Sequence, residues 1–275
     1  MNKPKDPTDR PSARFPASLH QAKPAAVKAR PELLRPQRLL HEAARDARLL
    51  STPSGLGLDN PAVRERMVQR LRGEGVRSEP VLQAMLRVPR HRFVDSALAA
   101  QAYEDTSLPI GLGQTISKPS VVARMLEWLF LGESARGHGH LGRVLEIGTG
   151  CGYQTALLAE VAQQVVSIER LRALHDVAVR QLAGLQTPRC ELLYGDGMLG
   201  HPLRAPYDSI VAAAGGEDLP QAWLQQLAVG GRLIAPARAA DGRGQVLVVV
   251  DRTPQGFRRT LGEAVQFVPL KSGIS

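Results

Sequence analysis

The 275-residue chain has only two cysteines, few aromatic residues and no long apolar run. Cys151 and Cys190 form no C-x-x-C motif and no Cys/His ligand pattern, so we expect two small buried thiols rather than a disulfide framework or a metal site. Aromatic residues make up 4% of the chain, too few to indicate a base-stacking nucleic-acid surface. Without a run of about 18 apolar residues or an apolar secretory signal, the sequence predicts a cytoplasmic protein with no membrane partner.

Positive charge and proline are concentrated at the N-terminus. The chain carries 35 Lys and Arg against 26 Asp and Glu, a net charge of +9, and residues 1–60 contribute +5 of it together with 8 of the 20 prolines. We predict that residues 1–60 form a largely disordered, basic extension with one short helix over 37–50. A solvated tail is the favoured interpretation; a tether to RNA or acidic partners and an organelle transit peptide are the alternatives.

The most informative motif lies at 144–153 and reads VLEIGTGCGY. Its apolar residues predict a buried strand that contains Glu146. The glycines that follow, Gly148, Gly150 and Gly152, predict a tight turn before a helix. A strand, a glycine turn and a helix in this order bind a nucleotide-like ligand, because the backbone can approach it and the first N–H groups of the helix face it. The G-x-G-x-G spacing differs from the dinucleotide fingerprint, and the absence of a following Lys-Ser/Thr pair excludes a P-loop.

The next predicted strand, over 165–169, ends in Glu169. A carboxylate at that position can accept hydrogen bonds from both hydroxyls of an adenosine ribose. A third predicted strand ends at the turn GDG of residues 195–197, and the carboxyl ends of parallel strands meet at one edge of a sheet. The sequence therefore favours a nucleoside-containing ligand at this edge over a glycine turn that binds nothing.

From residue 143 onward, predicted strands alternate with predicted helices, which is typical of a parallel sheet. The strands are expected over 143–147, 165–169, 190–194, 207–213, 231–236, 246–251 and 258–268, and the helices over 153–162, 171–184 and 220–228. Gly230 and Gly231 are predicted to stop the last helix, and the strands after it should form an antiparallel edge. The fold class is therefore α/β, with a doubly wound, mostly parallel seven-stranded sheet and an N-terminal helical extension.

The segment before the sheet is predicted to be mostly helical. Its helices begin at Pro61 and span 79–87 and 120–131. Residues 132–142 are predicted to be a loop, and because the two histidines of this loop lack a third ligand, no metal site is expected there.

The chain resembles the class I S-adenosylmethionine-dependent methyltransferases and, more narrowly, the protein-L-isoaspartate O-methyltransferase family. The resemblance covers about residues 61–270 and is carried by VPRHRFV at 88–94, YED at 103–105, LPIG at 108–111, GQTISKP at 113–119, the glycine loop through 155, YGDG at 194–197, YD at 207–208 and FVPL at 267–270. The GQTISKP segment is the most specific of these, because the glycine loop alone would indicate only the superfamily.

The resemblance implies S-adenosyl-L-methionine as the cofactor and a Rossmann-like methyltransferase domain over 61–275, with a substrate lid over 61–142 and a cofactor-binding sheet over 143–275. Ser117 corresponds to the family's active-site serine, and Asp196 with Gly197 would hold the adenine edge. The implied cofactor-binding residues are Thr115, Ile116, Ser117, Glu146, Gly148, Gly150, Gly152, Glu169, Arg170, Asp196 and Gly197.

The reaction implied by the resemblance is methyl transfer to the free α-carboxylate of L-isoaspartyl residues in damaged proteins and peptides, which initiates their repair or turnover. Such a carboxylate titrates near about 3.5 and is ionised at neutral pH, so no general base is required. Ser117 is the expected catalytic residue and would orient the carboxylate; its alternative role is the N-cap of the helix after Pro119. Two departures from the family pattern, Lys118 and the run AAGG at 213–216, lie near the expected substrate entrance.

Two other functions compete with this one. The first is a class I methyltransferase that acts on RNA or a small molecule and is guided by the basic extension. The second is a cofactor-binding adaptor without catalysis, against which the intact Ser117, Glu169 and Asp196 argue. We expect a monomer whose partners are isoaspartyl proteins and peptides rather than nucleic acid.

Overall fold

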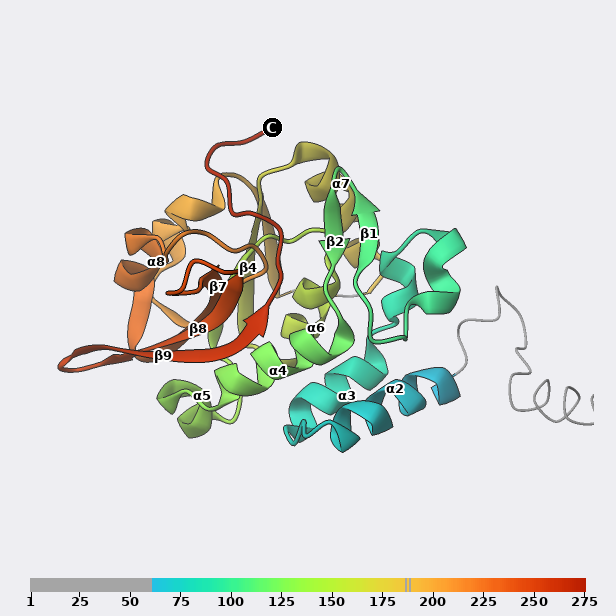
Figure 1. Ribbon diagram of the computed structural model, residues 1–275, viewed down its shortest axis with the longest axis horizontal. Coiled ribbons are helices and arrows are strands. Elements are labelled where there is room, and N and C mark those ends of the chain that lie inside the picture. The colour runs from blue at the N-terminus through green and yellow to red at the C-terminus, as the bar shows by residue number, and fades with distance from the viewer. Residues whose placement is uncertain (1–60, 186, 188) are drawn as a thin grey trace, which may run out of the picture. The chain divides into compact units, whose positions relative to one another are not determined.

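The computed structural model describes residues 61–275 apart from residues 186 and 188. The predicted extension over 1–60, with its helix over 37–50, lies outside the described residues. In the described part, a seven-stranded sheet carries helices on both faces (Figure 1). The predicted α/β, doubly wound fold is therefore confirmed.

The strand order of the sheet is β5-β4-β3-β6-β7-β8-β9. Neighbours from β5 to β7 are parallel, whereas β8 and β9 are antiparallel, as the sequence predicted for this edge. The strands are β3 (Arg143–Ile147), β4 (Gln164–Glu169), β5 (Cys190–Tyr194), β6 (Tyr207–Ala212), β7 (Leu227–Arg238), β8 (Gln245–Thr253) and β9 (Gly256–Val265). The strand order reverses between β3 and β6, and a sheet of this kind binds its ligands beyond the carboxyl ends of the strands at that point.

Alternate side chains of the central strands build two separate cores, one on each face of the sheet. Val144 of β3 belongs to the core under the helices α2 (Pro61–Gly73), α3 (Glu79–Arg87), α4 (Pro119–Phe130) and α6 (Tyr153–Val161). Its neighbour Leu145 belongs to the opposite core, together with Trp223 of α8 (Gln221–Gln226). This alternation is the two-residue period of a strand that is buried on both faces.

A short antiparallel hairpin lies outside the main sheet. Its strands are β1 (Leu108–Gly111) and β2 (Gln114–Ile116), and they pair only with each other. Figure 1 shows this hairpin beside the C-terminal segment, which ends near the top of the view. The chain passes directly from β2 into α4, so the hairpin brings the GQTISKP segment to the end of the sheet that carries the glycine loop.

Two details of the predicted elements are wrong. The predicted loop over 132–142 contains the short helix α5 (Glu133–His138), which ends at Gly139 in the left-handed conformation that commonly terminates helices. The last predicted helix stops at Gln226, and Gly230 and Gly231 lie inside β7. A Cβ on Gly231 would come within 3.0 Å of the Asp208 carbonyl oxygen, so this glycine permits a close approach of β7 to β6 at an irregular point of their pairing.

Candidate active site

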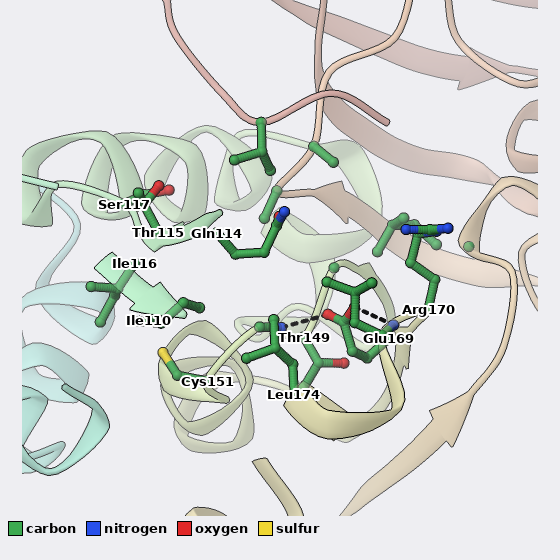
Figure 2. Close-up of a pocket in the computed structure, with 18 of the residues that line it drawn as sticks. Ile110, Gln114, Thr115, Ile116, Ser117, Thr149, Cys151, Glu169, Arg170 and Leu174 are labelled. Carbon is green, nitrogen blue, oxygen red and sulfur yellow. Dashed lines mark hydrogen bonds between the residues drawn. The ribbon is translucent and has the colours of Figure 1, made fainter. Parts of the chain in front are cut away.

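A cavity of about 390 Å³ opens at the carboxyl ends of β3, β4 and β6. Four parts of the chain surround it: the β1–β2 hairpin, the loops that follow β3 and β4, Ala213 and Ala214 after β6, and residues 268–271 near the C-terminus (Figure 2). Because these parts are far apart in the sequence, only the fold brings them together.

Most of the predicted cofactor-binding residues line this cavity. Those that do are Thr115, Ile116, Ser117, Gly148, Gly150, Glu169, Arg170 and Gly197. Glu146, Gly152 and Asp196 do not line it. The cavity also includes residues that the sequence did not single out as site residues, namely Ile110, Leu112, Gln114, Val122, Cys151, Leu171, Leu174 and residues 268–271.

Glu169 is held at the edge of the cavity by two backbone groups. The N–H of Gly150 donates to Glu169 Oε2 at 2.8 Å, and the N–H of Leu171 donates to Oε1 at 2.9 Å (Figure 2). The residue is only 5% exposed. A carboxylate oxygen can accept more than one hydrogen bond, so both oxygens keep capacity for a further donor such as a ribose hydroxyl.

Glu146 lies beneath the glycine loop and is completely buried. It accepts hydrogen bonds from the hydroxyls of Thr155 and Ser167, at 2.5 and 2.6 Å, and from the amide of Gln154 at 3.1 Å. Burial raises the pKa of Glu146 to about 7, although these hydrogen bonds favour its charged form. Glu146 therefore joins β3, β4 and α6 under the loop and does not face the cavity.

Gly152 and Asp196 also support the cavity from outside. A Cβ on Gly152 would lie 3.2 Å from two carbons of Leu182, so this glycine lets α7 (Arg172–Ala183) pack against the loop. Asp196 accepts a hydrogen bond from the Met198 N–H at 2.9 Å and another from the Gly273 N–H at 2.6 Å. The second bond ties the C-terminal segment to the turn after β5.

Arg170 fastens the same segment from the other side. Its Nε donates to the Gly273 carbonyl at 2.9 Å, and its own carbonyl accepts from the Ser275 N–H at 2.9 Å. Residues 273–275 are therefore hydrogen-bonded to the residues that follow β4 and β5. These bonds hold residues 268–271 in place at the cavity. Nothing in the local sequence of FVPL at 267–270 indicates that this segment returns to the cavity.

A buried cation fixes the backbone of Ser117. Arg90 is fully buried; its Nε donates to the Ala102 carbonyl and its Nη2 to the Ser117 carbonyl, both at 2.7 Å. Its guanidinium carbon lies 4.7 Å from the centre of the Tyr153 ring, and Tyr153 lines the cavity. Burial lowers the pKa of Arg90, and the guanidinium forms no ion pair with an acid of the described residues. Its positive charge thus lies directly behind the wall formed by Ser117 and Tyr153.

The predicted alternative role of Ser117 as a helix cap is wrong. Lys118 occupies the position before α4, and no side chain at that position caps the helix. Instead the carboxylate of Asp105 accepts from the N–H and the hydroxyl of Ser120, at 2.9 and 2.8 Å. Because Asp105 satisfies the first turn of α4, the Ser117 side chain remains available to the cavity.

Among the described residues, neither cysteine is a reactive nucleophile and no cluster of ligands forms a metal site. Cys151 lines the cavity but is buried, and burial raises the pKa of its thiol to about 11, which keeps it neutral. Cys190 is half-buried, and burial raises its pKa to about 12. Across residues 61–275, with the two gaps, no group of three or more His, Cys, Asp or Glu could hold a metal ion, and no helix could cross a membrane.

Comparisons with family models, with curated proteins and with solved structures all point to one family. The family model for protein-L-isoaspartate(D-aspartate) O-methyltransferase matches residues 62–275. A protein-L-isoaspartate O-methyltransferase of Methylibium petroleiphilum is 60% identical over 265 residues, which cover 96% of this chain and 97% of that protein. The protein of the same name from Leptothrix cholodnii is 60% identical over 242 residues, 88% of this chain and 84% of that protein. A solved protein-L-isoaspartate O-methyltransferase superposes with a TM-score of 0.68 at 29% identity and covers 77% of this chain and 67% of that one.

We predict that Glu146 makes the stability of the protein fall as the pH rises. Its pKa in the folded state, about 7, lies above its ordinary value of 4.5, so the protonated form favours folding. The contribution is full below about pH 4.5 and is lost as the pH rises through 7, an effect of about 3 kcal/mol. Thermal unfolding of Glu146→Gln should lack this slope, whereas Glu65→Gln, at an exposed position of α2, should keep it. An identical slope in Glu146→Gln and the wild type would contradict the assignment.

We also predict that Arg90→Lys loosens the Ser117 backbone. A lysine keeps the charge but carries all its donors on one nitrogen, so it cannot reproduce the separate positions of Arg90 Nε and Nη2, and the free energy of unfolding should fall by about 1–3 kcal/mol. The KM of the acceptor should rise more than the Kd of the cofactor, because Ser117 and the glycine loop are held separately. Chemical denaturation and steady-state kinetics measure the two effects, with Arg180→Lys on the exposed side of α7 as the control. Equal changes in KM and Kd would show a general loss of structure instead.

Proposed function

The chain belongs to the protein-L-isoaspartate O-methyltransferase family, and from this premise we propose how its cavity performs the family reaction. The enzyme transfers the methyl group of S-adenosyl-L-methionine to the free α-carboxylate of L-isoaspartyl residues in damaged proteins and peptides, which initiates their repair or turnover. The observation that carries the proposal is that Ser117, which follows the β1–β2 hairpin, and Glu169, at the end of β4, line one cavity.

The residues at the β4 side fit a nucleoside. Glu169 would bind the ribose hydroxyls, because both of its oxygens keep acceptor capacity beside their backbone partners. The backbones of Gly148 and Gly150 would lie against the methionine and ribose part, and Gly197 against the adenine. A direct bond from Asp196 to the adenine stays a prediction, since the Asp196 carboxylate contacts Met198 and Gly273. When bound, the cofactor supplies an electrophilic methyl group.

The residues at the hairpin side fit an anionic acceptor. We assign Ser117 the role of donating its hydroxyl hydrogen to one oxygen of the isoaspartyl α-carboxylate, which leaves the other oxygen free to attack. The positive charge of Arg90 behind this wall favours an anion there. Thr115 and Ile116 complete the wall, and the apolar side chains of Ile110 and Val122 help to exclude water.

The cavity needs no general base for this reaction. The residues that line it include no histidine, and the one carboxylate among them, Glu169, is bound by two backbone N–H groups. The acceptor is already ionised at neutral pH, so no proton has to be removed. Rate enhancement then comes mainly from holding the two reactants in contact, which can supply about 7–11 kcal/mol.

The alternative of an RNA or small-molecule methyltransferase is not favoured, because the relatives that match nearly the whole chain carry one name. Within the described residues no helix could cross a membrane. The monomeric state and the cytoplasmic location stay predictions from the sequence, as does the division at residue 60, whose first part lies outside the described residues.

The function is tested with two peptides that differ only in the linkage of one residue. Labelled S-adenosyl-L-methionine should transfer its methyl group to the isoaspartyl peptide and not to its aspartyl counterpart. In the isoaspartyl form the chain continues through the β-carbonyl and the α-carboxylate is free, whereas in the aspartyl form the α-carbonyl is part of the peptide bond. Transfer to both peptides at the same rate would contradict the assigned acceptor.

The division of roles between Ser117 and Glu169 predicts opposite kinetic effects. Ser117→Ala should lower kcat/KM for the isoaspartyl peptide by about 10- to 100-fold, the value of one hydrogen bond to a charged group, and leave the Kd of S-adenosylhomocysteine within about two-fold. Glu169→Ala should raise that Kd by at least about 100-fold, because two such bonds are lost. Calorimetry and the methyl-transfer assay separate the two effects. A Ser117→Ala enzyme with normal kcat/KM would remove Ser117 from the active site.

A further inference from the structure

Of the two lysines in residues 61–275, one lines the cavity and the other directly follows a residue that lines it. Residues 61–275 contain 22 arginines but only Lys118 and Lys271 as lysines. Lys118 follows the cavity residue Ser117 directly, at the start of α4, and its side chain is exposed. Lys271 is exposed as well and lines the cavity from the C-terminal segment. Lys271 therefore lies in the cavity wall, and Lys118 is the exposed neighbour of a wall residue on a different segment.

The acidic groups on the neighbouring segments are already engaged. Asp105 binds Ser120 through both carboxylate oxygens. The Glu169 oxygens hold two backbone N–H groups, and Glu104 lies 4.0 Å from an Arg70 guanidinium nitrogen. Among the ion pairs of the described residues, none joins either lysine to an acid. Both ammonium groups are thus left available to an acidic side chain of the acceptor polypeptide.

From this placement we infer that Lys118 and Lys271 select isoaspartyl sites whose neighbouring residues are acidic. The inference rests on the proposed function, because the isoaspartyl α-carboxylate itself is assigned to Ser117. The residues on either side of that isoaspartyl must then pass over the rim, where the two ammonium groups attract carboxylates.

The chemistry of lysine suits this task better than that of arginine. A lysine is a compact, hydrated charge on a flexible stem, whereas arginine pairs with a carboxylate in a fixed two-pronged geometry. An isoaspartyl residue can occur in many sequence contexts, so the distance from it to the nearest acid varies. Flexible point charges accept this variation, and they yield a general preference for acidic neighbours rather than a fixed sequence motif.

The effect of each lysine should be modest and sensitive to salt. Ion pairs between exposed groups change an equilibrium by about two- to five-fold each, because water screens them and long side chains lose freedom. At about 0.15 M salt the screening length is about 8 Å, so only acids close to the isoaspartyl residue contribute.

The test uses the full-length enzyme and three isoaspartyl peptides that differ only in the residues flanking the isoaspartyl position, which are Glu, Gln or Lys. At low salt, kcat/KM of the wild type should be highest for the Glu-flanked peptide and lowest for the Lys-flanked one, and high salt should reduce the differences between the three values.

Lys118→Gln and Lys271→Gln should each reduce the ratio of kcat/KM for the Glu-flanked and Gln-flanked peptides by about two- to five-fold, and the double variant should reduce it by about ten-fold. The charge-retaining Lys118→Arg and Lys271→Arg should keep most of the preference. Arg66→Gln, on α2, which contributes no residue to the cavity, should leave it unchanged.

Other outcomes would overturn the inference. If the lysine variants lost the same factor in kcat/KM for all three peptides, the lysines would support the fold instead. A raised Kd of S-adenosylhomocysteine would show that they help to bind the cofactor. Inhibition by an RNA oligonucleotide that disappears in the double variant would assign them to nucleic acid. Turnover without any flank preference would refute the inference alone, whereas no turnover of the Gln-flanked isoaspartyl peptide would refute the proposed function itself.

Discussion

The cavity depends on the contact between the Glu169 carboxylate and the backbone N–H groups of Gly150 and Leu171. This contact joins the loop after β3 to the loop after β4 and holds a charged group at their meeting point. Beneath it, Glu146 binds side chains of β4 and α6 and keeps the strand ends in register with the helix that follows. Each oxygen of the Glu169 carboxylate accepts one backbone hydrogen bond and can accept another. The carboxylate is therefore held in position to bind the two hydroxyls of a ribose.

The two ends of the cavity are built by different physical means. The cofactor end uses backbone groups at strand ends, which the parallel sheet positions by itself. The acceptor end uses a hairpin that has no place in the main sheet, and the buried Arg90 guanidinium and the Asp105 carboxylate fix it instead. The C-terminal segment, bonded to Asp196 and Arg170, borders both ends. The hairpin side can therefore be altered without changing the backbone groups that form the cofactor end.

Sequence patterns predicted the helices and strands well where local signals were strong. They failed where a contact with a distant segment determines the role of a residue. The helix over 79–87 and the strands over 143–147 and 190–194 have the predicted bounds, because apolar periodicity and flanking breakers coincide there. The glycines at 230 and 231 were interpreted as a helix stop, but their role is a close approach of β7 to β6. Ser117 had the local signature of a helix cap, and Asp105, from before the hairpin, provides that cap.

The sequence by itself determined the α/β fold, the order of its strands and helices along the chain, and the glycine loop with Glu169, because these follow from periodicity and from short spacings. Only the tertiary structure decided which residues share the cavity. It left Glu146, Gly152 and Asp196 outside the cavity lining and placed Arg90 behind Ser117. It also brought residues 268–271 to the cavity rim. The physical reason is that burial and long-range hydrogen bonds depend on segments that no local pattern connects.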